Sequence, residues 1–329
     1  MTAQPMPGSD DEAFGRLLEA QRRDLVLLAY RFLGSIHEAE EAAQETTVRA
    51  WRGRSSFRGD ASLRTWLHRI ATRVCLDALG SRGRRVHPTA LGPAADPTRP
   101  PEPPTWEVTW LEPLPAEYLV DATLDPAARY SLRESVSLAF LAALQTLPPR
   151  QRAVLILRDV LAWTAPEVAG LLEMTVGAVT SALHRARTAL RHSHHLTGLE
   201  AMTGSSPDDP RIRRLLEAYV QAWENDDVDG LVATLRHDVR LAMPPSPSWY
   251  AGPDAVGEMV RRWIFAPGPA RRFRLRLTGA NGGPAAGFLE SRQDGSFVPV
   301  GLHVLAVAPD GIGAVTVFMD PLVGARFAG

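Results

Sequence analysis

The chain has 329 residues, of which 45% are hydrophobic, and a formal net charge of −1 at pH 7. This length predicts two or three globular domains. A single cysteine, Cys75, excludes an internal disulfide and favours a reducing compartment. The chain shows no secretory leader and no apolar run of the roughly 20 residues that cross a membrane. We therefore expect a cytoplasmic protein that has no contact with a membrane.

Charge is distributed unevenly along the chain, and arginine replaces lysine throughout. Residues 91–126 hold one arginine against seven acidic residues, whereas residues 1–90 and 127–200 are each mildly basic. A DNA-binding protein needs only a local basic face, so the neutral total does not exclude nucleic acid. These shifts predict a first module at 11–87, an acidic proline-rich linker at 88–126, a second module at 127–196 and a further domain at 208–329.

The first module is predicted to contain three amphipathic helices. The first is ended by Gly34, the second begins with acidic residues that suit the positive end of a helix, and Ser62 caps the third. Trp51 and Trp66 share the helical spacing of apolar residues, which favours core packing over base stacking. The loop at 57–62 is the better candidate for holding an unstacked base, and arginines on the third helix can follow phosphates. The candidate residues for melted DNA are Phe57, Arg58, Gly59, Asp60, Ser62, Arg64, Arg69 and Arg73.

The second module contains a predicted helix-turn-helix. Thr164 and Glu167 form a capping box, the turn lies at 173–174, and Thr175 caps a second, longer helix. A further amphipathic helix at 132–146 is expected to support it. The residues expected to be buried on the longer helix are Val176, Val179, Leu183, Ala186 and Leu190. The opposite, DNA-reading face carries Thr175, Gly177, Thr180, Ser181, His184, Arg185, Arg187, Thr188 and Arg191. An ordinary helical hairpin with a solvated face is the alternative interpretation.

Two stretches resemble conserved regions of sigma-70-family transcription initiation factors. HEAEEAAQETTVRAW with FRGDASLRTWLHRIATRVCLDAL resembles their second region, and LPPRQRAVLILRDVLAWTAPEVAGLLEMTVGAVTSALHRARTAL resembles their fourth. The absence of a large region between them is similar to the extracytoplasmic-function (ECF) group. The resemblance implies that core RNA polymerase binds Glu40, Glu41 and Gln44, with aspartate commoner in the family at position 41. It also implies that the loop at 57–62 and the arginines after it hold the −10 element, and that the helix at 176–190 reads the −35 element.

The linker combines proline and acidic residues with a central apolar stretch, TWEVTWLEPLPAEYLVD. Its composition predicts a poorly ordered, extended segment. By resemblance it replaces the family linker, which runs through the polymerase cleft. Its apolar side chains are expected to dock on the polymerase or on a neighbouring domain of this chain, with a plain surface patch as the alternative. These side chains are Trp106, Trp110, Leu111, Leu114 and Tyr118.

The C-terminal domain is predicted to begin with helices at 211–224, 228–235 and 255–265 and to continue as a strand meander. AYVQAWENDDVDGLVATLRHDVRLAMPP with WYAGPDAV resembles the SnoaL-like cone fold, whose members enclose a pocket. The candidate lining residues are Tyr219, Trp223, Met243, Trp249, His303 and Asp320. His303 is more typical of a satisfied core residue, and Asp320 of a turn. Without a paired acid and base, we expect no catalytic residues and no cofactor. The histidines at 192–195 point apart on a helix, so no metal site is expected.

The predicted fold is therefore multidomain, with two all-α domains, the second a helix-turn-helix, followed by an α+β cone-shaped SnoaL-like domain. The predicted function is that of an ECF sigma factor that binds core RNA polymerase and promoter DNA. Its C-terminal domain would dock on the sigma core or the linker in cis, and a small ligand could bias that docking. A helix-turn-helix regulator with a small-molecule-binding domain, or a fused enzyme, is the alternative.

Overall fold

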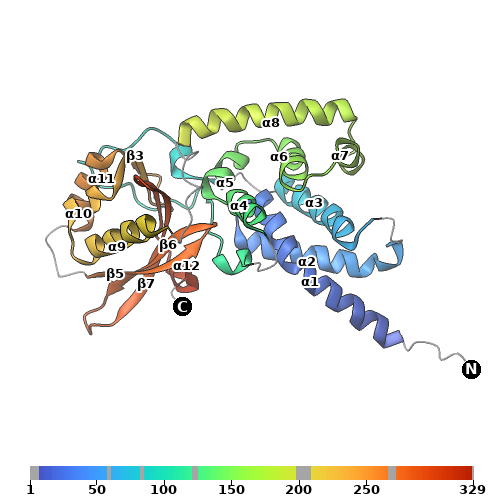
Figure 1. Ribbon diagram of the computed structural model, residues 1–329, viewed down its shortest axis with the longest axis horizontal. Helices are drawn as coiled ribbons and strands as arrows, with labels where there is room; N and C mark the ends of the chain where they lie inside the picture. Colours follow the sequence, from blue (N-terminus) through green and yellow to red (C-terminus); the bar gives the residue numbers. More distant parts are fainter. Residues whose placement is uncertain are drawn as a thin grey trace, which may run out of the picture. The chain divides into compact units, whose positions relative to one another are not determined.

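A computed structural model describes residues 7–57, 61–81, 85–120, 125–197, 209–265 and 272–327 (Figure 1). The chain forms two compact units, one of Met1–Gly83 with Leu147–Thr188 and the other of Arg84–Thr146 with Ala189–Gly329. Each unit thus combines two segments that are separated in the sequence, and the second unit contains the linker. No helix in the described ranges is long and apolar enough to cross a membrane.

The first three helices of the first unit pack around a shared apolar core that includes Leu28, Phe32 and Leu67. Gly34, with φ of +70°, ends the first helix because glycine adopts left-handed backbone conformations without steric cost. The Ser35 hydroxyl then accepts a hydrogen bond from the Glu38 N–H at 3.1 Å and starts the second. The elements are α1 (Pro7–Leu33), α2 (Ile36–Arg52), the 3₁₀ turn η1 (Arg54–Ser56) and α3 (Leu63–Ser81).

Trp51 and Trp66, which were predicted to be core residues, are only half-buried. Trp51 packs against Phe14 with ring centroids 5.9 Å apart, and Trp66 packs against Phe57 at 5.3 Å. Both rings therefore lie at the edge of the helical core rather than in its centre.

The helix-turn-helix belongs to the same unit as far as Thr188 and confirms the predicted capping box at Thr164 and Glu167. Glu173 ends the short helix with φ of 54°, and the Thr175 hydroxyl accepts from the Ala178 N–H at 3.1 Å to start the long one. The elements are α6 (Pro149–Leu155), the π-helical turn η4 (Ile156–Val160), α7 (Ala165–Leu172) and α8 (Val176–Thr197).

Burial on α8 follows the predicted spacing in part. Val179, Leu183 and Ala186 are buried, but Val176 is 47% exposed and Leu190 is only half-buried. The prediction for Val176 was wrong because this residue begins the helix, where no earlier turn of α8 flanks it.

Within the first unit, α3 and α6 are in contact. The buried guanidinium of Arg152 on α6 donates to the Phe32 carbonyl at 2.5 Å and to the Leu147 carbonyl at 3.3 Å. The Arg69 guanidinium on α3 lies 6.0 Å from the Trp163 ring centroid, a cation–π distance. One buried hydrogen bond, from Arg152 to Phe32, and one contact of the exposed Arg69 thus join the helices of the two predicted sigma regions.

The second unit is built on a six-stranded sheet in the order β4-β3-β8-β7-β6-β5, in which only β3 and β8 pair in parallel. One face packs against α9, α10 and α11, and the other against α12 with Leu138 of α5. This arrangement confirms the α+β prediction, although β3 starts at Leu235, inside the predicted second helix. The elements are α9 (Pro210–Glu224), α10 (Val228–Ala233), β3 (Leu235–Ala242), β4 (Trp249–Ala251), α11 (Pro253–Met259), η5 (Val260–Ile264), β5 (Phe273–Ala280), β6 (Gly283–Ser291), β7 (Phe297–Ala308), β8 (Gly311–Phe318) and α12 (Pro321–Phe327).

The linker and the helices after it also belong to the second unit. The single helix predicted at 132–146 is divided at 135–137, because the Ser137 hydroxyl caps a new helix by accepting from the Phe140 N–H at 3.3 Å. The second of these helices, α5, belongs to the unit of the sheet, and its Leu138 packs against the sheet. The elements are β1 (Arg85–Val86), η2 (Pro88–Ala90), β2 (Thr109–Trp110), η3 (Ala116–Leu119), α4 (Pro126–Glu134) and α5 (Leu138–Gln145).

Candidate nucleic-acid interface and linker-docking site

The face of α8 opposite its buried side presents the predicted −35 residues. All of them except Thr188 are exposed, and Thr188 is half-buried. Gly177 has open space around its Cα, so the start of the helix is narrow enough for close approach to a base pair. The Thr180 hydroxyl donates to the Val176 carbonyl at 3.0 Å, and this bond orients its oxygen along the helix.

Arg187 on this face is held by an acidic partner that the sequence did not indicate. Its guanidinium pairs with both carboxylate oxygens of Asp159, at 2.7 and 2.9 Å. This hydrogen bonding and the charge of Asp159 raise the pKa of Arg187. Two parallel N–H···O bonds fix the fork of the guanidinium, so a phosphate must compete with Asp159 for it.

The predicted −10 residues occupy the start and outer face of α3. The Ser62 hydroxyl caps the helix by accepting from the Thr65 N–H at 3.1 Å, and Phe57 covers Trp66. Arg58, Gly59 and Asp60 lie outside the described residues. Arg69 and Arg73 line a surface hollow together with Trp66 and with Glu167 of α7.

Arg64, also on this face, is paired with the half-buried carboxylate of Asp24 on α1. Its Nε lies 2.7 Å from Asp24 Oδ2, which also bonds His68 Nε2 at 2.7 Å. Burial raises the pKa of Asp24, but hydrogen bonds from His68 and Arg64 outweigh it and hold that pKa well below its usual range. Asp24 therefore stays ionised, and its hydrogen bonds hold the Arg64 guanidinium in place.

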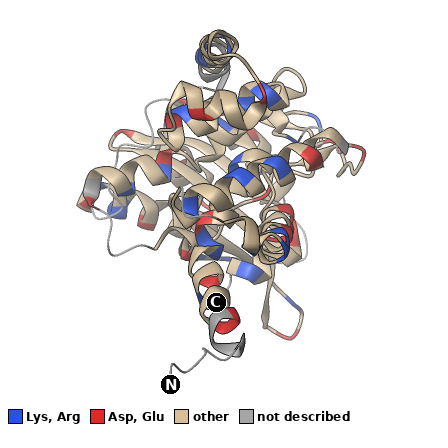
Figure 2. Ribbon diagram, turned by 90° about the vertical axis from the view of Figure 1, so that its right-hand side faces the viewer, with Lys and Arg blue, Asp and Glu red and all other residues tan. Residues whose placement is uncertain are grey.

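The acidic side of α2 is solvent-facing where the polymerase-docking residues were predicted. Glu41 and Gln44 are exposed and Glu40 is half-buried, whereas Ala39, Ala42 and Ala43 face the core. Figure 2 shows acidic and basic residues interspersed along the helices. The negative charge that a basic partner could contact is thus carried by one side of α2, and the first unit as a whole is not uniformly acidic.

The six residues predicted to line a pocket in the C-terminal domain fall in different places. The Tyr219 hydroxyl lies 2.8 Å from His303 Nδ1, and both groups lie in the apolar core beside Trp223 and Met243. His303 is fully buried, and burial lowers its pKa to about 3.

The other two lie outside that core. Trp249 Nε1 donates to the Gly92 carbonyl at 3.0 Å, and the Asp320 carboxylate accepts from the Leu322 N–H at 2.8 Å, at the start of α12. Trp249 thus contacts the linker, and Asp320 stabilises the turn that precedes α12.

A contact between the β5–β6 turn and the linker was missed by sequence reasoning. The Asn281 side chain accepts from the Leu114 N–H at 3.0 Å and donates to the Val136 carbonyl at 2.8 Å. The Asn281 N–H also donates to the Leu114 carbonyl at 2.9 Å. Asn281 and Gly282 have φ of 51° and 77°, which suits an Asn-Gly hairpin turn. We call this set of three hydrogen bonds the Asn281 clamp.

The residue after Asn281 must be glycine for steric reasons. A Cβ at this position would lie 2.7 Å from Arg133 Cβ at the end of α4. Only glycine allows both the left-handed backbone and this close approach. The Asn-Gly pair was a visible turn signal, but nothing in the sequence showed what the turn touches.

The rest of the linker follows the edge of the sheet through a series of hydrogen bonds. The Ala95 N–H donates to the Trp249 carbonyl at 2.7 Å, and the Thr105 N–H donates to the Pro245 carbonyl at 3.0 Å. The Glu102 N–H donates to the Ser248 hydroxyl at 2.9 Å. Such regular pairing contradicts the prediction of a poorly ordered spacer. Of the apolar side chains predicted to dock, Trp110, Leu111 and Leu114 are buried, Tyr118 is half-buried and Trp106 is 75% exposed.

Three family models match the chain: Sigma-70 region 2 over residues 17–85, Sigma-70, region 4 over 137–190, and the SnoaL-like domain over 216–317. The helical fold and these matches define an RNA polymerase sigma factor of the sigma-70 type that carries a SnoaL-like domain. The ECF RNA polymerase sigma factor SigG of Mycobacterium tuberculosis is 43% identical over 323 residues, which are 95% of this chain and 83% of SigG. The chain therefore belongs to the family of ECF RNA polymerase sigma factors.

Two further comparisons concern SigJ, another ECF sigma factor of Mycobacterium tuberculosis. Its sequence is 29% identical over 263 residues, covering 80% of this chain and 75% of SigJ. Its crystal structure matches 93% of this chain and 96% of SigJ with a TM-score of 0.55 at 22% identity, which shows a shared fold. These findings confirm the predicted family and fold class. As a sigma factor, the chain binds core RNA polymerase and directs it to promoter DNA, as predicted.

Proposed function

We propose that the SnoaL-like domain regulates promoter use in cis by holding the linker. The Asn281 clamp carries this proposal, because it attaches both Leu114 of the linker and Val136 before α5 to one turn of the sheet. A linker attached in this way cannot at the same time extend through the polymerase cleft. The docked state is therefore the less active one, and release of the linker accompanies promoter recognition in the cytoplasm.

The residue roles follow from the exposed faces. The polar start of α8, with Thr180, Ser181 and His184, contacts base edges of the −35 element, and the arginines that follow contact phosphates. The loop at 57–62 and the basic face of α3 hold the −10 element. Glu40, Glu41 and Gln44 dock α2 on core polymerase. When DNA binds, the Arg187 guanidinium leaves Asp159 and pairs with a phosphate.

The SnoaL-like domain acts without catalysis. Its one close acid–base candidate in the described residues, Tyr219 with His303, is fully enclosed by aromatic side chains such as Phe288. Burial raises the pKa of Tyr219 above its usual range and lowers that of His303. Both groups are therefore neutral at physiological pH and lie in packed core, which supports a structural role.

Transcription with purified core RNA polymerase tests the proposal. A genomic promoter library is transcribed with the full-length chain and with the Asn281→Gly variant, which opens the clamp. We expect specific run-off transcripts from both, and more from the variant. Equal or lower output from the variant would contradict cis inhibition. Tight binding of duplex promoter DNA without polymerase, and no transcripts, would instead favour a conventional helix-turn-helix regulator.

A further inference from the structure

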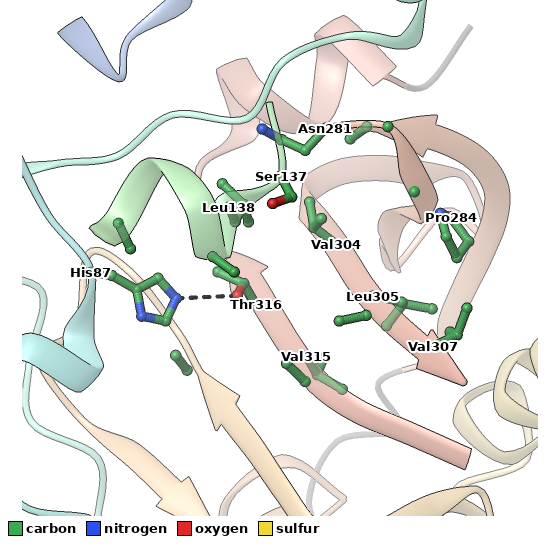
Figure 3. Close-up of a pocket in the computed structure, with 18 of the residues that line it drawn as sticks. His87, Ser137, Leu138, Asn281, Pro284, Val304, Leu305, Val307, Val315 and Thr316 are labelled. Carbon is green, nitrogen blue, oxygen red and sulfur yellow. Dashed lines mark hydrogen bonds between the residues drawn. The ribbon is translucent and has the colours of Figure 1, made fainter. Parts of the chain in front are cut away.

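A cavity of about 90 Å³ lies in the second unit, on the face of the sheet opposite the core formed by α9–α11 (Figure 3). Strands β3, β7 and β8 form its floor, and the β5–β6 turn closes one end. Leu138 of α5 and its N-cap Ser137 form one wall, and His87, beside Thr89 of the linker, forms another. The sheet, the linker and α5 thus each contribute side chains to one space.

The walls of the cavity are apolar with a few convergent polar groups. His87 lies 3.2 Å from the Thr316 hydroxyl through Nε2 and 2.9 Å from the Thr89 hydroxyl through Nδ1. Burial, with a smaller effect of the Arg240 charge, lowers the pKa of His87 to about 4, so the ring is neutral at pH 7. The apolar wall residues are Leu138, Ala139, Ala142, Ala242, Val304 and Ala314.

The charge at the cavity is positive. Arg133 and Arg240 line it, and no aspartate or glutamate is among its described lining residues. The Arg240 guanidinium stacks at 5.6 Å from the Trp249 ring centroid and donates no hydrogen bond to a described residue. Its near neighbour in the strand, Asp238, is bonded to Arg236 at 2.9 Å. Arg240 is therefore a half-buried cation that forms no ion pair with an acid among the described residues, although the charge of Asp238 acts on it.

We propose that this cavity binds a small organic monoanion, of the size of a four-carbon carboxylate, with its chain on the apolar walls and its carboxylate on Arg240. Guanidinium groups pair with carboxylates through two parallel hydrogen bonds, and the volume suits only a few carbon atoms. Because the sheet, the linker and α5 all contact the ligand, it binds the docked state more tightly than the released one. Only this regulatory consequence rests on the function proposed above; binding itself does not.

Isothermal titration of the full-length chain with butyrate, and with its neutral analogue butyramide, tests the site. Butyrate is expected to bind, and butyramide at least about tenfold more weakly, because a hydrogen bond to a charged group contributes more than a neutral one. Arg240→Met is expected to weaken butyrate binding by about tenfold or more. Arg274→Met is the matched control, since Arg274 stacks on Phe297 at 4.2 Å on the same sheet but outside the cavity.

A second variant keeps the test informative if Arg240→Met unfolds. Ala142→Leu fills the cavity from α5 and is expected to abolish butyrate binding while Arg240 remains. Equal binding of butyrate and butyramide, unchanged binding by both variants, or no butyrate binding up to about 10 mM would overturn the proposed site. If Asn281→Gly lost transcription control but still bound butyrate as before, only the proposed coupling between butyrate binding and linker docking would be contradicted.

Discussion

Replacing Asn281 with glycine isolates the contribution of one side chain to linker docking. Asn281 is 3% exposed and has a left-handed backbone conformation, which glycine adopts without strain. The substitution therefore removes the side-chain hydrogen bonds to Leu114 and Val136 and leaves the turn itself intact. The backbone bond between Asn281 and the Leu114 carbonyl is retained.

The expected cost follows from the two backbone groups that lose their partners. A buried donor or acceptor left unsatisfied costs about 1–2 kcal/mol, so the pair costs about 3 kcal/mol. Each 1.4 kcal/mol or so changes an equilibrium about tenfold, so the released linker becomes roughly a hundredfold more populated.

Amide hydrogen exchange measures this population directly. Exchange at residues 110–116 and 135–138 is expected to accelerate by up to about a hundredfold in Asn281→Gly, because exchange follows the free energy of local opening. Asp226→Gly is the control, since Asp226 occupies an exposed turn with φ of 53° away from the linker. Unchanged exchange in Asn281→Gly would refute the assignment of the clamp as the attachment of the linker.

Three further predictions concern DNA binding and pH. Asp159→Asn frees Arg187 and should tighten promoter binding by the holoenzyme about two- to fivefold at low salt, measured by fluorescence anisotropy; weaker binding would contradict the exchange of partners. His184→Ala should change the preferred −35 sequence, whereas Arg187→Ala should weaken all promoters alike; equal losses from both would reverse the orientation of α8. Burial lowers the folded pKa of His87 to about 4, below its unfolded value, so stability is lost as pH falls from about 6.5 towards 4. His303, whose pKa burial also lowers, adds a loss of similar size over the same pH range. Urea unfolding between pH 7.5 and pH 5 should therefore show about 2 kcal/mol less loss of stability in His87→Gln than in the unchanged chain.

Local signals explain what could be predicted from the sequence alone. The Thr164–Glu167 capping box, the Thr175 cap and the Ser62 cap each act within three residues, and the structure contains all three. Apolar spacing identified the buried side of α8 and the strands of the C-terminal sheet. The sigma motifs are continuous stretches of sequence, so the family was also visible without a structure.

Tertiary contacts decided the rest. Leu114 and Asn281 are 167 residues apart, and Arg187 and Asp159 are 28 apart, so no local pattern links either pair. The linker looked like a spacer because its proline and acid content disfavours helices and strands, yet its backbone pairs with loops of the sheet. The sequence by itself determined most of the helices and strands, because their signals repeat every two to four residues, but not the break at 135–137 between α4 and α5. Where the linker, Asn281 and Arg240 lie depended on distant segments packing together, and only the tertiary structure decided it.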